Sequence, residues 1–215
     1  MKNGLLIVGA GGHGKVVADA ALLQAAWQKI AFVDRDPNVT ETLGLPVFSG
    51  EPADDQLRED FSDAVVAIGN AATRLTLLDS LHRMGYRLPV IQHPRAVVST
   101  RSEIGPGSVL FANAVVNPDC VLGRGCIVNT AATIDHDCVL AEGVHIAPGA
   151  HLAGGVRVGR ATWIGLGACV REYLSIGDEV TIGAGAVVVN DIRAGQCVAG
   201  VPARPDFGSN TRQPT

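Results

Sequence analysis

The sequence predicts a small α/β unit followed by an all-β parallel β-helix, in which short strands stack coil upon coil. Two patterns predict this fold: a glycine-rich turn between a strand-like and a helix-like segment near the N-terminus, and a six-residue period of aliphatic residues from Val98 to Val188. The composition agrees, because 47% of the residues are hydrophobic but only 4% are aromatic. Such a core suits thin repeated layers better than one bulky centre.

The first part of the chain alternates predicted strands and helices. The segment LLIVGAGGHGKVVADAALLQA, residues 5–25, is typical of a strand, a glycine turn and a helix. The further elements are a strand at 30–34, a strand at 63–70 that ends in a second glycine turn, a helix at 73–85 and a strand at 88–92. This alternation indicates a parallel α/β unit, which we expect to span residues 1–92.

The first glycine turn has the form of a nucleotide-binding turn. Gly9, Gly11 and Gly14 match G-x-G-x-x-G, and the next strand ends at Asp34, twenty residues after Gly14. Such a turn directs backbone N–H groups and a helix N-terminus toward an anion. The unit is too short for the second half of a dinucleotide fold, so a nucleotide diphosphate suits it better. A tight turn that only packs helix against strand is the alternative.

The repeat occupies the rest of the chain, which we expect to form one domain over residues 93–204. Every sixth residue from Val98 to Val188 is Val, Ile or Leu, without a break in register. The residue four positions after each of these is nearly always small, which fits a narrow interior where coils stack like on like. Cys120, Cys126 and Cys138 fall in this small column, so we interpret them as buried apolar residues. Residues 205–215 are predicted to be a mobile polar tail.

Four features in order carry a resemblance to a known family: GAGGHGKV at 9–16, the hexapeptide repeat, IDHDC at 134–138 followed by VHIAPGA, and AGVPAR at 199–204. Together they resemble the acetyltransferases that act on nucleotide-linked amino sugars, such as UDP-4-amino sugars and GDP-perosamine, within the hexapeptide acyltransferases. The resemblance implies a left-handed β-helix of about five coils with three hexads each. It also implies a homotrimer with active sites at the subunit interfaces.

The same resemblance assigns the catalytic residues. In the family, a His between acidic residues is the general base, and His136 matches it. The acid that orients this base matches Asp137, and a second His that meets the acetyl end of acetyl-CoA matches His145. An imidazole with a pKa near 6.5 suits proton removal from an amine at neutral pH.

The resemblance also implies two sets of binding residues. The positions that match the family's nucleotide-sugar site are Gly11, Gly12, His13, Asp34, Arg35 and Gly69. Those that match its acetyl-CoA site, beside His145, are Leu166, Ala184, Val201 and Pro202. Relatives often carry a second acid where this chain has Arg35, which leaves the nucleotide base open. The implied activity is an N-acetyltransferase that uses acetyl-CoA, without a metal, on a nucleotide-linked 4-amino-4,6-dideoxy sugar.

Other functions remain open at this point. An O-acetyltransferase for sialic acid would use the same base, whereas a serine O-acetyltransferase would not need the glycine-rich unit. A non-catalytic or metal-binding β-helix is a third alternative, but His136, His145 and His151 fall at hexad positions that spread them around the coil. We assign no role to His151, Cys169 or Cys197.

The charge and the apolar pattern exclude some partners. The net charge is −4 and no basic stripe is present, which argues against nucleic acid. The apolar runs are too short to span a bilayer, and the N-terminus lacks the pattern of a signal peptide. Five cysteines, an odd number without a CxxC pair, favour reduced thiols. We therefore expect a cytoplasmic protein.

Overall fold

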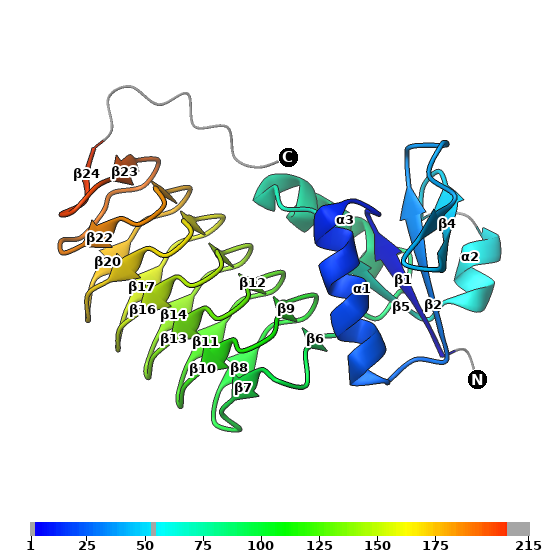
Figure 1. The fold of residues 1–215 in the computed structure, drawn as a ribbon, viewed down its shortest axis with the longest axis horizontal. Coiled ribbons are helices and arrows are strands. Elements are labelled where there is room, and N and C mark those ends of the chain that lie inside the picture. The colour runs from blue at the N-terminus through cyan, green and yellow to red at the C-terminus, as the bar shows by residue number, and fades with distance from the viewer. Residues whose placement is uncertain (1–2, 53–54, 206–215) are drawn as a thin grey trace.

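The structure is a computed structural model that describes residues 3–52 and 55–205. Figure 1 shows an α/β unit beside a long stack of coils, with the N-terminus at the outer end of the α/β unit. The two units are in contact along one face of the coil stack. The combination of an α/β unit and a parallel β-helix confirms the predicted fold class.

The α/β unit has a five-stranded sheet in the order β3-β4-β2-β1-β5. Its elements are β1 (Gly4–Val8), α1 (Gly12–Gln24), β2 (Lys29–Asp34), β3 (Glu41–Thr42), β4 (Leu45–Ser49), α2 (Asp55–Asp60), β5 (Asp63–Val66) and α3 (Ala71–Arg83). Strands β1 and β5 are buried along their whole length, as expected for parallel strands covered on both faces. Gly14 is required for the close approach of α1 to β1, because a Cβ there would collide with the carbonyl oxygen of Gly9.

The strand predicted at 88–92 does not join this sheet. Arg87 forms an isolated bridge with Asp63 of β5, and the chain then crosses to the coil stack. Only β6 (Ile91–Gln92) is a strand, and it pairs with Val109–Leu110 of the first coil. Pairing along the coil stack therefore begins just before the boundary expected after residue 92.

The coil stack is a three-sided prism built from short parallel strands. In chain order the strands are β7 (Val97–Val98), β8 (Glu103–Ile104), β9 (Val109–Leu110), β10 (Val115–Val116), β11 (Val121–Leu122), β12 (Ile127–Val128), β13 (Thr133–Ile134), β14 (Val139–Leu140), β15 (His145–Ile146), β16 (His151–Leu152), β17 (Arg157–Val158), β18 (Trp163–Ile164), β19 (Cys169–Val170), β20 (Ser175–Ile176), β21 (Thr181–Ile182), β22 (Val187–Val188), β23 (Cys197–Ala199) and the antiparallel β24 (Arg204–Pro205).

Three sheets form the sides of the prism. The first sheet contains β7, β10, β13, β16, β19 and β22; the second contains β8, β11, β14, β17 and β20; the third contains β6, β9, β12, β15, β18, β21, β23 and β24. From β6 to β19, each strand pairs with the strand eighteen residues later, as in Val116↔Ile134, whereas β21 pairs with β23 sixteen residues later. Three hexads therefore make one regular coil of a left-handed β-helix.

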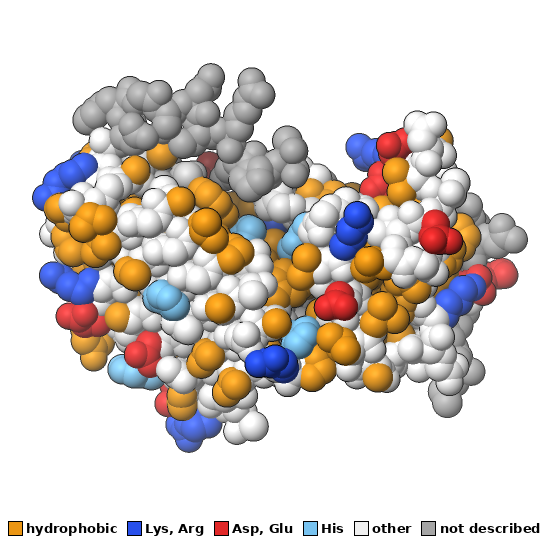
Figure 2. Space-filling model, viewed as in Figure 1, with side chains coloured by type: hydrophobic (Ala, Val, Ile, Leu, Met, Phe, Trp, Pro, Cys, Tyr) orange, Lys and Arg blue, Asp and Glu red, His pale blue; other side chains and the backbone are white. Residues whose placement is uncertain are grey.

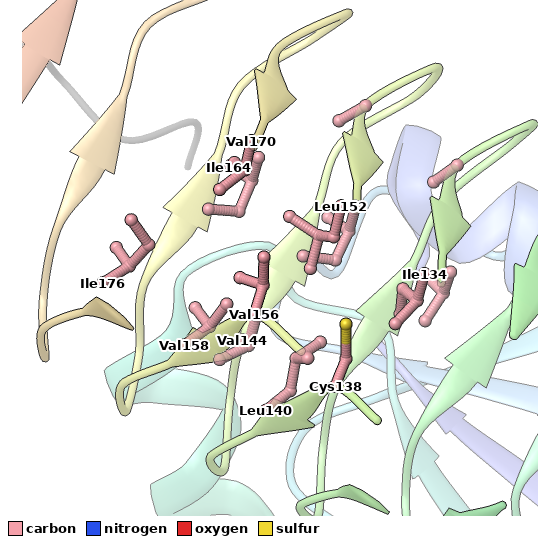
Figure 3. Close-up of a cluster of buried hydrophobic side chains, with 14 of the residues drawn as sticks. Ile134, Cys138, Leu140, Val144, Leu152, Val156, Val158, Ile164, Val170 and Ile176 are labelled. Atoms are coloured by element: carbon pink, nitrogen blue, oxygen red, sulfur yellow. The ribbon is translucent and has the colours of Figure 1, made fainter. Parts of the chain in front are cut away.

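The interior of the prism is filled by the two predicted columns. The large aliphatic residues and the small residues form one continuous buried cluster along the prism axis, part of which is drawn in Figure 3. Cys120, Cys126 and Cys138 are at most 1% exposed and belong to this cluster, which confirms their interpretation as core residues.

The corners of the prism explain the many glycines in this part of the sequence. From position 107 to 185, every sixth residue has a positive φ, the left-handed conformation that glycine adopts without strain. Non-glycine residues hold this conformation at Asn113, Asp119, Ala131, Asp137, Ala161, Tyr173 and Glu179. Two of them, Asp137 and Tyr173, matter for the site described below.

The junction between the units combines apolar packing with one buried charge. Val109 and Ile127 of the third sheet, with Phe111 directly after β9, pack in a cluster with Val17 and other residues of the α/β unit. Arg74 of α3 is only 1% exposed. Its guanidinium donates to four carbonyl oxygens at 2.7–2.9 Å, those of Ile68, Gly69, Gly125 and Gly143. Because two of these carbonyls belong to each unit, Arg74 fixes the α/β unit to the prism.

A candidate acetyl-transfer site

His136 lies at the corner between β13 of the first sheet and β14 of the second. Its Nδ1 is 2.7 Å from Oδ2 of Asp137, which occupies a left-handed corner position with a φ of 60°. Asp135 accepts hydrogen bonds at 2.8 Å from the backbone N–H of His136 and from Nδ2 of Asn117. Asp137 therefore contacts the imidazole of His136, whereas Asp135 fixes the backbone at this corner.

The same contacts set the protonation of this corner. The hydrogen bond with Asp137 raises the pKa of His136 above its usual value, and the charges of Asp135 and Asp137 add to the effect. The pKa of Asp135 is lowered, mainly by the N–H of His136. When the neutral imidazole keeps its proton on Nδ1, toward Asp137, its Nε2 carries a free lone pair. With 51% of its side chain exposed, His136 can present this lone pair to a bound molecule.

His145 lies on a different side of the prism, on β15 of the third sheet. Burial lowers its pKa to about 3, and the positive charges of Arg74 and His13 act in the same direction. Its Nε2 is 3.2 Å from Nδ2 of Asn129. An amide nitrogen donates, so Nε2 accepts and the ring proton resides on Nδ1. His145 is therefore neutral at physiological pH and can act only through hydrogen bonds.

His13 lies close to His145, across the junction between the two units. Burial and the charge of Arg74 lower the pKa of His13 to about 4. Its ring stands edge-on to Phe111 of the prism, with 5.6 Å between the ring centroids. Within the described residues, Nε2 of His13 and Nε1 of Trp163 are buried without a hydrogen-bond partner. Figure 2 shows several histidine side chains close to the junction.

The glycine turn of the α/β unit is open to solvent. No heavy atom lies within 4 Å of a Cβ built at Gly11 or Gly12, and α1 begins there without a side-chain cap. The first N–H groups of α1 are thus available to an anion. Gly69, by contrast, lies at the junction, where its carbonyl accepts from Arg74.

Asp34 and Arg35 line a pocket of about 140 Å³ at the carboxyl ends of β1 and β2. Asp34 accepts hydrogen bonds from the N–H groups of Ala10 at 2.7 Å and Asp36 at 3.0 Å, and these contacts lower its pKa. Arg35 pairs with Glu51 of the same pocket at 2.8 Å. Asp34 thereby also holds the glycine turn, a role that the sequence did not indicate.

The residues predicted for acetyl-CoA follow His145 toward the C-terminal end of the prism. Leu166 and Ala184 lie at successive corners between the third and first sheets, and both are exposed. Val201 is 73% exposed and is joined to Pro202 by a cis peptide bond. His136 lies at the opposite edge of this side of the prism, at the corner between the first and second sheets. One chain therefore does not bring the predicted base and the predicted acetyl-CoA residues together.

Sequence reasoning missed three residues of these sites: Arg74, Asn117 and Asn129. Asn117 precedes Asp135 by one coil of eighteen residues, and Asn129 stands beside the strand that pairs with His145. The coil period could therefore have indicated both asparagines. No comparable signal indicates Arg74, since its place depends on how the α/β unit docks.

Comparison with known proteins identifies the family to which this chain belongs. Residues 4–81 match the family model described as the PglD N-terminal domain. A UDP-N-acetylbacillosamine N-acetyltransferase of Bacillus subtilis is 35% identical over 115 residues, which is 52% of this chain and 52% of that protein. The acetyltransferase domain of PglB from Neisseria gonorrhoeae is 47% identical, with a TM-score of 0.91, 94% of this chain covered and 99% of that one. The chain belongs to this acetyltransferase family.

Other members of the acetyltransferase family have been solved with ligands. The PglB domain has been solved with acetyl coenzyme A. A variant of the GDP-perosamine N-acetyltransferase of Caulobacter crescentus, solved with CoA and GDP-perosamine, is 37% identical. That match covers 97% of this chain and 99% of that one, with a TM-score of 0.92. The family predicted from the sequence is thus confirmed.

Two further findings concern only the described residues. None of their helices is long and apolar enough to cross a bilayer. Nowhere in residues 3–52 and 55–205 do three or more His, Cys, Asp or Glu side chains gather in a group that could hold a metal ion.

Proposed function

We propose that this protein transfers the acetyl group of acetyl-CoA to the amino group of a nucleotide-linked 4-amino-4,6-dideoxy sugar. The observation that carries the proposal is the exposed His136–Asp137 pair, in a chain that is similar along nearly its whole length to a GDP-perosamine N-acetyltransferase. The α/β unit, residues 1–92, would bind the sugar nucleotide, and the prism, residues 93–204, would carry the chemistry.

His136 acts as the general base in this proposal. The amine of the sugar attacks the thioester carbonyl, a C–N bond forms, and Nε2 of His136 takes the proton that the nitrogen loses. The C–S bond then breaks, and the proton passes from Nε2 to the departing thiolate of CoA. Asp137 keeps the imidazole oriented and stabilises its charged form. General base catalysis of this kind contributes about 10²–10⁴ in rate.

His145 suits a different task, the stabilisation of the oxyanion. Its lowered pKa keeps the ring neutral, and its contact with Asn129 leaves the proton on Nδ1. We assign to Nδ1–H the role of a donor to the thioester oxygen, on which negative charge develops as the amine attacks. A neutral donor suits this role because it cannot protonate the incoming amine.

We further propose a homotrimer in which each site is shared by two copies. The first sheet forms one side of the prism, with the corner that carries His136 at one edge of this side and the corner that carries Leu166 and Ala184 at the other edge. A second copy whose corner with Leu166 and Ala184 meets the His136 corner of the first would complete the site. Size measurement in solution, together with crosslinking between these corners, tests the assembly.

The sugar nucleotide would bind where the glycine turn meets the junction. The N–H groups at Gly11, Gly12 and His13 suit the diphosphate, and the pocket of Asp34 and Arg35 suits the nucleoside. Acetyl-CoA and sugar nucleotides are soluble metabolites, and all five cysteines are free thiols. We therefore place the reaction in the cytoplasm.

The experiment that tests the function is a panel of UDP-, GDP- and dTDP-linked 4-amino sugars, each incubated with acetyl-CoA and followed by mass spectrometry. The expected result is the gain of one acetyl group by at least one amino sugar, and loss of this activity in His136→Ala. Acetylation of free sialic acid instead would replace the acceptor. Wild-type turnover by His136→Ala would remove the base from the mechanism.

A further inference from the structure

Tyr173 is an exposed aromatic residue in a conformation that bulky side chains rarely adopt. Its φ is 57°, and it is 74% exposed. Non-glycine residues are uncommon in the left-handed region, and bulky residues are particularly uncommon there. The exposed ring gains little from burial within the chain. Six other corner residues share the left-handed conformation, but Tyr173 is the only aromatic residue among the seven.

The position of Tyr173 relates it directly to His136. His136, the pair Gly154–Gly155 and Tyr173 occupy the same prism corner in three successive coils. A Cβ built at Gly154 would lie 2.6 Å from Nε2 and Cε1 of His136, and a Cβ at Gly155 would collide with the ring of Tyr173. The two rings therefore lean from opposite sides onto the same pair of glycines.

The position of Tyr173 along the prism axis indicates which of the two substrates it contacts. The α/β unit contacts the early coils, through Gly125 and Gly143. Tyr173 lies two coils beyond His136 in the opposite direction. Leu166 and Ala184, the residues expected to bind acetyl-CoA, precede and follow it in the sequence, so Tyr173 lies between their levels on the prism axis. In the proposed trimer, the copies would be related by rotation about an axis parallel to the prism. Such a rotation does not change the height of a residue along the prism, so Tyr173 of one copy also lies between the heights of Leu166 and Ala184 of the next copy.

We infer that Tyr173 is a binding residue for the acetyl donor, whose ring packs against the pantetheine arm of acetyl-CoA as the thioester reaches His136. The pantetheine arm carries methylene and methyl groups that suit an aromatic face, and its amides suit the phenol hydroxyl. The pair Gly154–Gly155 leaves the corner between the two rings free of side chains. This inference rests on the proposed acetyl-CoA-dependent function.

The test measures the binding of two probes, coenzyme A and adenosine 3′,5′-bisphosphate, which lacks the pantetheine arm. In Tyr173→Ala, the Kd for coenzyme A should rise on the order of tenfold, equivalent to about 1.4 kcal/mol. The Kd for adenosine 3′,5′-bisphosphate should not change. Tyr173→Phe should keep most of the affinity for coenzyme A, because it keeps the ring. Glu179→Ala is the matched control, since Glu179 is also exposed and left-handed but lies on another corner.

Three results would overturn the inference: unchanged binding of coenzyme A by Tyr173→Ala, an equal loss for both probes, or a raised KM for the amino sugar alone. The last would make Tyr173 part of the acceptor site. Because the binding assay needs no acceptor, failure of every amino sugar as substrate would leave the result for Tyr173 readable. A wild-type protein that does not bind coenzyme A would overturn both the inference and the proposed function.

Discussion

The imidazole of His136 covers Gly154, one coil later, so closely that its Nε2 occupies the space of a Cβ at that position. The observed orientation of the proposed base therefore requires that residue 154 has no side chain. Gly154 does not have a positive φ, so an alanine there adds bulk without backbone strain.

Gly154→Ala should displace the ring of His136 and lower kcat at least tenfold, while the melting temperature changes little. A displacement of about 1 Å is enough to lose much of the benefit of orientation. Steady-state kinetics and thermal unfolding of the variant test this. In a His136→Ala background the same substitution should have no further effect, and additive losses in the double variant would contradict the explanation.

The pH dependence of catalysis should report the His136–Asp137 pair. Since the base must be neutral, kcat/KM should fall as the pH decreases through a pKa above the usual value for His. Asp137→Asn removes the largest cause of the raised pKa, so the acidic limb should move to lower pH and the maximal rate should drop. A pH–rate profile of both proteins with a saturating donor measures this. An acidic limb at the same pH in both would assign it to another group.

The buried histidines at the junction should make stability depend on pH below neutrality. The folded-state pKa of His145 is about 3 and that of His13 about 4, whereas both titrate near 6.5 in the unfolded chain. The unfolded state then binds more protons between these values, so stability is complete above pH 6.5 and decreases as the pH falls. At pH 5 each ring should cost about 1–2 kcal/mol. Urea unfolding of wild type and His145→Asn at pH 5 and pH 7 tests this, with a flatter profile expected for the variant.

Arg74 should be essential for the attachment of the α/β unit to the prism. Arg74→Ala leaves buried carbonyls of both units without a donor, and we expect a loss of about 3–5 kcal/mol. Arg74→Lys should restore only part of it, because an ammonium cannot reproduce the planar fork of donors. Arg101→Ala, which removes an exposed ion pair with Asp119, is the control and should cost less than about 1 kcal/mol. Equal unfolding free energies for the two alanine variants would refute the role of Arg74.

The sequence predicted the prism well, because a six-residue period determines which side chains face inward once a coil contains three hexads. It also predicted the contact between His136 and Asp137, since neighbours on one corner stay neighbours after folding. The junction was beyond sequence reasoning. Arg74 lies in a helix pattern where an arginine is normally expected at the surface, and the depressed pKa values of His13 and His145 follow from docking of the two units.

The separation between His136 and the residues expected to bind acetyl-CoA could also be recognised only from the folded structure. His136 and His145 are nine residues apart in the sequence, yet they belong to different sides of the prism because half a coil lies between them. Residues that are close together in a short motif can thus lie on different sides of the prism. In the sequence, this separation was indicated only by the different positions of the two histidines within their hexads.

The eighteen-residue pairing step restricts how this chain can change in length. Loss or gain of a single residue within a coil would turn the following aliphatic side chains toward solvent, because neighbouring positions of a strand face opposite ways. The removal or insertion of a complete coil of eighteen residues keeps every later residue facing as before. Such an event would alter the reach between the His136 corner and the Val201–Pro202 loop in steps of about 4.8 Å, so that donor length and catalytic geometry can vary independently in evolution.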